Sequence, residues 1–361
     1  MILFNNPKNY YLENKKEIIS ITKNFFESGF YVKSNSLEKF EKNFANYVGS
    51  KFCIGVGNGT DALYLSLKCL DIKSGDEIII PSHTATGTGT AVLMCNAKPI
   101  FADVDDSLNI DVNNIEKLIT KKTKAIIPVH LYGQPCEILK LKKIANKYKI
   151  KIIEDCSQSF GTKLNDQHTG TFGLFGCFSF YPTKNLGCFG DGGAIITNSK
   201  SKAKLLYSMR EYGWNSDRNA INFGINSRLD ELQSYYLNFK LKNFDNNLNR
   251  KIKIANRYFD EIKNPKIKFL QNVPNSKHSY HLFVVRVKNR EMLIKKFNKN
   301  GIYPGIHYKL PLHKQSQFIK YYKKNHLINT NQIVKEILSI PIYPELKIQE
   351  QDKVIKIINS F

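Results

Sequence analysis

An acidic residue and a lysine follow two successive apolar segments near the middle of the 361-residue chain. Asp155 comes directly after the run Lys151–Glu154, and Lys184 comes shortly after the run Cys177–Phe180. If both runs are strands of a parallel α/β sheet, their carboxyl ends lie at the same edge, where such sheets bind ligands. The two side chains would then face one site.

A lysine and an acid in one pocket suit pyridoxal 5′-phosphate (PLP), which needs a lysine for a Schiff base and an acid beside its pyridinium nitrogen. Asp155 would keep that nitrogen protonated, and Lys184 would also move a proton as a base. Taken alone, Asp155 could cap a helix or bind Mg²⁺. Lys184 could be an ordinary surface lysine in a chain that has 54 basic residues. Only their joint spacing favours a PLP site.

A glycine-rich segment predicts a phosphate site. Residues 55–61 read Gly-Val-Gly-Asn-Gly-Thr-Asp, between an apolar run and a helical pattern. Backbone N–H groups at such a helix N-terminus bind anions, and the Ser179 hydroxyl could donate to the same phosphate. The spacing lacks the full Gly-x-Gly-x-x-Gly of a dinucleotide-binding loop. Thr60 could also be a plain N-cap, which is compatible with phosphate contact.

Seven short apolar runs supply candidate strands that would position these residues. They are Cys53–Val56, Glu77–Ile80, Pro99–Ala102, Ala125–Val129, Lys151–Glu154, Cys177–Phe180 and Ala194–Thr197. Amphipathic stretches lie between several of them, and this alternation predicts an α/β fold with a mostly parallel seven-stranded sheet between helices.

The order of predicted helices and strands changes after long helical segments at 228–248 and 251–263. The rest of the chain has an α+β pattern that ends in a helix at 349–360. We therefore predict an N-terminal segment and a large α/β domain over residues 1–247. A smaller C-terminal α+β domain would follow over residues 248–361.

Composition limits the classes of protein. No apolar run approaches the ~20 residues that span a bilayer, and the N-terminus lacks signal-peptide features, so we expect a cytoplasmic protein without a membrane partner. The seven cysteines form no CxxC pair and none lies with histidines at zinc spacing, so no metal is expected. The net charge of +23 could mark a nucleic-acid surface, but the lysines are spread out, and we expect no nucleic-acid partner.

Several segments, in matching order and spacing, resemble the DegT/StrS family of sugar aminotransferases. The segments are 58–63, 75–84, 128–135, 154–155, 190–193 and 224–233, together with Lys184. The resemblance implies a fold-type-I aminotransferase, a PLP cofactor and a homodimer with shared active sites.

The resemblance also implies roles for individual residues. Lys184 would be the Schiff-base lysine and Asp155 the pyridinium partner, with Gln158 beside the cofactor. The phosphate would be bound by Gly59, Thr60, Asp61 and Ser179, and by Asn226 of the other subunit. The sugar-nucleotide site would include Tyr181, His307, Tyr308 and His313. Asn226 could instead be a turn residue, and the histidines could be satisfied structural groups.

One position departs from the family pattern. The family usually places an aromatic residue two positions after His83, where it stacks on the PLP ring, but this chain has Ala85 there. Either His83 takes over as a cofactor-binding residue, or the ring packs on smaller groups.

The reaction that the resemblance implies is transfer of an amino group, from L-glutamate, to a keto-deoxysugar linked to dTDP, UDP or GDP. Tyr181-Pro182 resembles the branch that aminates C3 rather than C4, and a surface-glycan or related amino-sugar pathway would use the product. One alternative is a PLP-dependent sugar dehydratase, but those relatives carry histidine in place of Lys184. The other is a non-catalytic sensor, which would not need Asp155, Gln158, Ser179 and Lys184 together.

Overall fold

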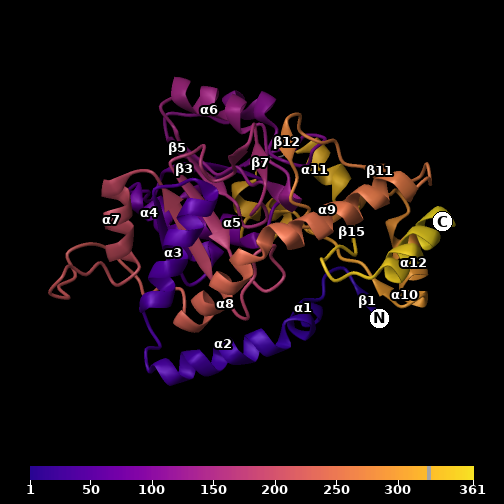
Figure 1. Cartoon of the computed structure of the whole chain (residues 1–361). Coiled ribbons are helices and arrows are strands. Elements are labelled where there is room, and N and C mark those ends of the chain that lie inside the picture. Colours follow the sequence, from indigo (N-terminus) through magenta and orange to yellow (C-terminus); the bar gives the residue numbers. More distant parts are fainter. Residues whose placement is uncertain (323–326) are drawn as a thin grey trace.

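A seven-stranded sheet forms the centre of the computed structural model, which describes residues 1–322 and 327–361 (Figure 1). Its strands, in chain order, are β2 (Phe52–Val56), β3 (Glu77–Pro81), β4 (Lys98–Ala102), β5 (Thr123–Ile126), β6 (Lys151–Asp155), β9 (Phe175–Ser179) and β10 (Gly193–Thr197). The spatial order is β2-β10-β9-β6-β5-β3-β4. β10 is antiparallel to both neighbours, and all pairs from β9 to β4 are parallel. The predicted mostly parallel seven-stranded sheet is confirmed.

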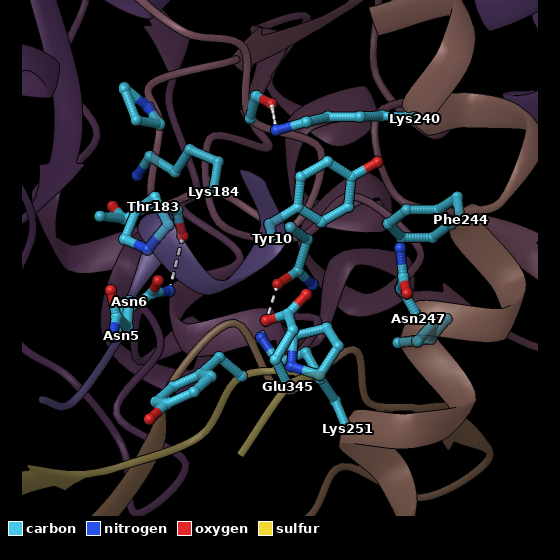
Figure 2. A pocket seen from close by; sticks show the side chains of 17 residues that line it. Asn5, Asn6, Tyr10, Thr183, Lys184, Lys240, Phe244, Asn247, Lys251 and Glu345 are labelled. Atoms are coloured by element: carbon cyan, nitrogen blue, oxygen red, sulfur yellow. Dashed lines mark hydrogen bonds between the residues drawn. The ribbon is translucent and has the colours of Figure 1, made fainter. Parts of the chain in front are cut away.

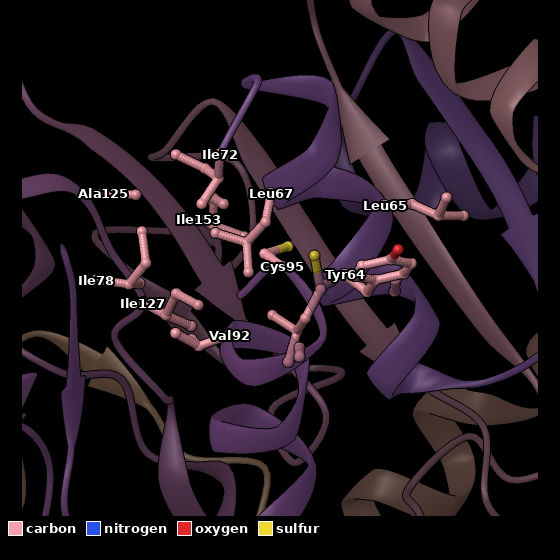
Figure 3. Close-up of a cluster of buried hydrophobic side chains, with 14 of the residues drawn as sticks. Tyr64, Leu65, Leu67, Ile72, Ile78, Val92, Cys95, Ala125, Ile127 and Ile153 are labelled. Atoms are coloured by element: carbon pink, nitrogen blue, oxygen red, sulfur yellow. The ribbon is translucent and has the colours of Figure 1, made fainter. Parts of the chain in front are cut away.

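Apolar side chains cover both faces of this sheet, because successive residues of a strand point to opposite sides. Ile78 and Ile80 of β3 belong to the cluster shown in Figure 3, whereas Ile79 packs in a second cluster with Ile152. The first cluster is covered by α4 (Gly59–Cys69), α5 (Thr86–Met94) and α7 (Lys200–Met209). The opposite face is covered by α3 (Asn35–Val48), α6 (Ile138–Lys147) and α8 (Glu231–Lys242).

The C-terminal region has its own sheet and core. Its strands are β11 (Lys268–Phe269), β13 (Phe283–Arg286) and β15 (Ile337–Ile340). They pack with α9 (Phe244–Glu261), α10 (Arg290–Lys299) and α12 (Ile348–Asn359). The predicted closing helix is therefore present, but α8 and α9 separate at Asn243 rather than near residue 250. The predicted domain boundary after residue 247 lies inside α9 and stays a prediction.

The N-terminal segment joins the two regions. β1 (Ile2–Leu3) pairs in parallel with β14 (Ile302–Tyr303), and α1 (Pro7–Glu13) and α2 (Lys15–Ser28) then run along one edge of the molecule (Figure 1). The remaining elements include β7 (Lys163–Leu164), β8 (Gln167–His168), β12 (Ser276–Lys277) and α11 (Ile328–Ile333). Within residues 1–322 and 327–361, no helix combines the length and apolar character needed to cross a membrane.

Strand direction decides where the site forms. Because β2 and β9 are both antiparallel to β10, they run the same way as β3 and β6. The carboxyl ends of these strands therefore share one edge of the sheet. Asp155 and Ser179 end β6 and β9 at that edge, and α4 begins there just after β2.

Candidate active site

A cavity of about 340 Å³ lies at this edge of the sheet. It is lined by Asn58, Gly59, Thr60, Leu63, Thr84, Ala85, Gly87, Thr88, Val129, Asp155, Ser157, Gln158, Ser179, Tyr181, Lys184 and Asp191. Seven of the predicted site residues are in this set: Gly59, Thr60, Asp155, Gln158, Ser179, Tyr181 and Lys184. The fold thus brings together the lysine, the acid and the glycine-rich helix start.

Both carboxylate oxygens of Asp155 accept hydrogen bonds. Its Oδ2 accepts a hydrogen bond of 2.8 Å from the Thr88 hydroxyl, and its Oδ1 accepts one of 3.1 Å from the Ser157 backbone N–H. The Thr84 and Thr88 hydroxyls are 3.1 Å apart and form a short chain that leads to the carboxylate. The side chain is 3% exposed, so these bonds fix its orientation within the cavity wall.

Lys184 lies in the turn after β9, where its backbone N–H donates to the Tyr181 carbonyl at 2.8 Å. Burial lowers the pKa of its amino group to about 8, and the attraction of Asp155 partly opposes that shift. Burial disfavours the charged form of a lysine, and the neutral amine is the form that attacks a carbonyl or accepts a proton. Lys184 therefore has the properties of a nucleophile and a base.

The start of α4 forms the anion-binding end of the cavity. Asn58 caps the helix by accepting from the Asp61 backbone N–H at 2.9 Å. A Cβ on Gly59 would lie 2.8 Å from the Ser179 Cβ and 3.2 Å from the Ser157 Oγ, so only glycine fits between these two serines. Helix N-termini favour anions, and the serine hydroxyls add donors for a phosphate at this end.

Asp61 and Asn226 do not line the cavity of their own chain. The Asp61 carboxylate accepts from the Ser227 hydroxyl at 2.7 Å, and the same hydroxyl accepts from the Gly57 backbone N–H at 2.9 Å. Asp61 thus fixes the segment that carries Asn226, which is itself exposed. The role of Asn226 at the cofactor phosphate of another subunit stays a prediction.

Gln158 connects the cavity to the C-terminal region. Its Oε1 accepts from the Tyr132 backbone N–H at 2.8 Å, and its Nε2 donates to the Tyr308 hydroxyl at 2.8 Å. Burial, followed by repulsion from Asp155, raises the pKa of Tyr308. Burial and the nearby Lys184 charge lower the pKa of His307 to about 4. His307 and Tyr308 therefore lie close to the catalytic candidates, although they are not in the cavity wall.

His83 and His313 occupy buried positions outside the cavity wall. His83 Nε2 lies 2.6 Å from the Tyr132 hydroxyl, and burial lowers the pKa of this imidazole to about 4. His313 is bonded through both ring nitrogens, to Ser82 Oγ at 2.5 Å and to Asn331 Oδ1 at 3.2 Å. Ala85, not His83, lines the cavity, and the roles of His83 at the cofactor and of His313 at the substrate stay predictions.

The residue before Asp155 has a different environment. Glu154 accepts from three backbone N–H groups, those of Gly170, Phe172 and Gly173, and pairs with His130 Nε2 at 2.9 Å. Within the described residues, only Glu154, His130 and Cys156 place metal-ligand atoms within 4.8 Å of one another. Because the carboxylate oxygens are already used in hydrogen bonds, we interpret this cluster as structural.

The side chains fit PLP. A lysine, an acid and an anion-binding helix start converge on one cavity, and the crowding around Gly59 shows how closely the backbone approaches the anion end. Lys184 would hold the cofactor covalently, Asp155 its pyridinium nitrogen, and Gly59, Thr60 and Ser179 its phosphate. Sequence reasoning missed Thr88 and Ser157. Thr88 lies in the first turn of α5 and Ser157 two residues after β6, but nothing in their spacing indicates that they contact Asp155.

Comparisons with known proteins identify the family. The sequence model of the DegT/DnrJ/EryC1/StrS aminotransferase family matches residues 13–359 of this chain. The dTDP-3-amino-3,6-dideoxy-alpha-D-galactopyranose transaminase of Aneurinibacillus thermoaerophilus is 40% identical over 362 residues, covering 100% of this chain and 99% of that protein.

Solved structures give the same result. Streptomyces venezuelae DesV superposes with a TM-score of 0.96 at 33% identity, covering 100% of this chain and 97% of that one. NtdA of Bacillus subtilis, solved with bound cofactor PMP, superposes with a TM-score of 0.90 at 30% identity. The match covers 96% of this chain and 81% of NtdA. These matches confirm the predicted fold, PLP cofactor and enzyme class: the chain belongs to the DegT/DnrJ/EryC1/StrS aminotransferase family and is a PLP-dependent nucleotide-sugar aminotransferase.

Proposed function

We propose that this enzyme transfers an amino group from L-glutamate to C3 of a dTDP-linked keto-deoxyhexose. The observation that carries amino transfer is the meeting of Lys184, Asp155 and the α4 N-terminus in one cavity. The relative at 40% identity, whose name specifies a dTDP-3-amino-3,6-dideoxy sugar, supports both dTDP and C3. Tyr181 lines the cavity and belongs to the Tyr-Pro pair that favours C3 in the sequence.

Each residue has a defined task in this proposal. Bound PLP supplies the electron sink that stabilises a substrate carbanion. The Asp155 carboxylate, oriented by Thr88 and Ser157, holds a proton on the ring nitrogen. The neutral Lys184 amine attaches the cofactor and accepts a proton from the substrate carbon. A base with a pKa near 8 suits this task close to neutral pH.

The test compares matched sugar substrates. The purified protein, loaded with PLP, is given L-glutamate and either a 3-keto or a 4-keto dTDP-deoxyhexose, and the position of the new amine is determined by NMR. The proposal expects amination of the 3-keto sugar, with slower turnover of the UDP-linked analogue. Amination at C4 alone would overturn the C3 assignment. A borohydride-reducible PLP adduct that persists at this site in Lys184→Ala would overturn the role of Lys184.

We also propose that two copies share their active sites, with Asn226 reaching the cofactor phosphate of the partner. Its exposure next to the Asp61–Ser227 bond supports this, because the segment is fixed but Asn226 does not line the cavity of its own chain. Mixing Lys184→Ala with Asn226→Ala subunits should restore about a quarter of wild-type activity, since each hybrid dimer has one intact site. No gain over the unmixed variants would contradict sharing. The cytoplasmic location and the surface-glycan pathway stay predictions from the sequence.

A further inference from the structure

Lys184 also borders a second, smaller cavity of about 70 Å³ that Asp155 does not line. Figure 2 shows this rear cavity, with the N-terminal segment on one side and helices α8 and α9 on the other. Its polar lining residues are Asn5, Asn6, Tyr10, Thr183, Lys184, Asn185, Lys240, Asn247, Lys251, Tyr343 and Glu345. The cavity thus joins three distant parts of the chain directly behind the lysine that attaches the cofactor.

Lys251 of α9 fixes the turn that carries Lys184. Its Nζ donates to Asn185 Oδ1 at 2.9 Å and to the His281 carbonyl at 3.3 Å. The Asn185 amide in turn donates to the Ser279 carbonyl at 2.9 Å. The residue immediately after Lys184 is therefore held through a lysine that is only 5% exposed.

Glu345 supplies the opposite charge in the same cavity. It is 8% exposed, and its Oε1 has no hydrogen-bond partner within residues 1–322 and 327–361. Burial lowers the pKa of Lys251 to about 7 and that of Lys240 to about 8, and the charge of Glu345 opposes both shifts. Because Glu345 Oε1 has no partner among the described residues, neither ammonium contacts this oxygen directly. The Tyr10 hydroxyl, also in the cavity wall, likewise lacks a partner there.

This arrangement suits bound water. Burying a carboxylate oxygen without a hydrogen-bond partner is costly, and so is burying an ammonium bonded only to neutral acceptors. A polar cavity holds water when two to four polar groups surround it, and each water needs roughly 10–15 Å³ of such volume. Glu345, Tyr10 and Lys251 provide those groups, and the cavity has room for a few waters.

We propose that Lys251 and Glu345 form a water-bridged ion pair behind Lys184, and that this pair positions the Lys184 turn for attachment of the cofactor. The inference rests on the proposed role of Lys184 and deepens it. Lys251 and Glu345 are positioning residues, since they act on Lys184 through Asn185 and the cavity water.

The experiment compares Lys251→Met with Lys251→Arg. Two rates are measured: formation of the PLP Schiff base, from its absorbance after PLP is added to apoprotein, and carbamylation of Lys184 by cyanate in apoprotein, from peptide mass spectrometry. Lys251→Met should slow both about tenfold, because a misplaced reacting group loses its productive orientation. Lys251→Arg keeps a cation and should stay near wild type. Lys202→Met is the matched control, because Lys202 also donates to a backbone carbonyl, that of Cys69, far from this turn.

Wild-type rates in folded Lys251→Met would overturn the inference. Should Lys251→Met not fold, Glu345→Gln tests the same link, because it removes the charge at nearly constant shape. It should slow Schiff-base formation about threefold by weakening the hold on Lys251, and an unchanged rate would overturn the inference. A crystal structure without water between Glu345 and Lys251 would also overturn it. An adduct that survives in Lys184→Ala would instead overturn the proposed function, so the two failures are distinguishable.

Discussion

Strand β6 ends in two adjacent acidic residues that have opposite surroundings. Glu154 is 0% exposed and is surrounded by hydrogen-bond donors from the backbone at 170–173 and from His130. Asp155 lines the cavity, and among the described residues its carboxylate accepts only from Thr88 and Ser157. Because successive strand residues point to opposite faces, one carboxylate holds a loop and the other faces the cofactor site.

The comparison teaches that the number of donors already used separates a structural acid from a reactive one. A fully bonded carboxylate has no lone pair left for a ligand, whereas Asp155 is oriented but still open to the cavity. Removing Glu154 should therefore affect folding, and removing Asp155 should affect chemistry. Four experiments test this distinction.

The largest expected effect is that of Asp155→Asn on catalysis. The amide keeps the shape but no longer stabilises a proton on the pyridinium nitrogen, so the rate of amino transfer should fall about 10³-fold. Single-turnover absorbance measurements with L-glutamate check this. Thermal unfolding of the apoprotein should change little, and a variant that lost stability but not rate would contradict the assignment.

The reactivity of Lys184 should depend on Asp155 but not on Glu154. Burial lowers the pKa of Lys184 to about 8, so much more of this amine is neutral near pH 8 than in an ordinary lysine. Carbamylation of Lys184 in apoprotein should therefore rise with pH to a midpoint near 8. Asp155 favours the charged amine, so Asp155→Asn should move the midpoint lower, and Glu154→Gln should leave it in place. A midpoint near 10.5 in wild type would contradict the burial of this amine.

Glu154→Gln should act on stability. The amide nitrogen cannot accept the backbone N–H groups that the carboxylate accepts, so at least one buried donor loses its partner. We expect the free energy of unfolding to fall by about 3 kcal/mol, measured by urea titration of the apoprotein. Folded Glu154→Gln should still attach PLP at Lys184. Normal stability with lost activity would assign Glu154 to the active site instead.

The sequence alone was enough to predict the site residues that the ends of strands position. Asp155 and Ser179 end two strands whose carboxyl ends share an edge, and Lys184 follows the second of them. Gly59 begins a helix at that same edge, so the convergence of these residues follows from topology. The seven strands could be recognised because runs buried on both faces are continuously apolar.

The rest depended on pairings between distant residues. His313 is bonded to Ser82 across 231 positions, and Thr88 to Asp155 across 67. No local sequence pattern indicates such pairs, so the sequence alone could not predict which distant residues His313 and Asp155 contact. The rear cavity combines the N-terminal segment with α8 and α9, and for the same reason it had no sequence signal.

The smallest expected effect tests how far the orientation of Asp155 matters. Thr88→Val replaces the hydroxyl with a methyl group of similar size, so Asp155 Oδ2 loses its donor while the packing is preserved. A hydrogen bond to a charged group contributes about 1.5 kcal/mol, so kcat/KM for the sugar should fall about tenfold. The matched control is Thr86→Val, in the same helix, whose hydroxyl bonds Gln315 on the surface. Equal effects of the two variants would mean that the Ser157 N–H alone orients Asp155. The difference between Asp155 and Glu154 would then come only from the face of β6 that each residue occupies.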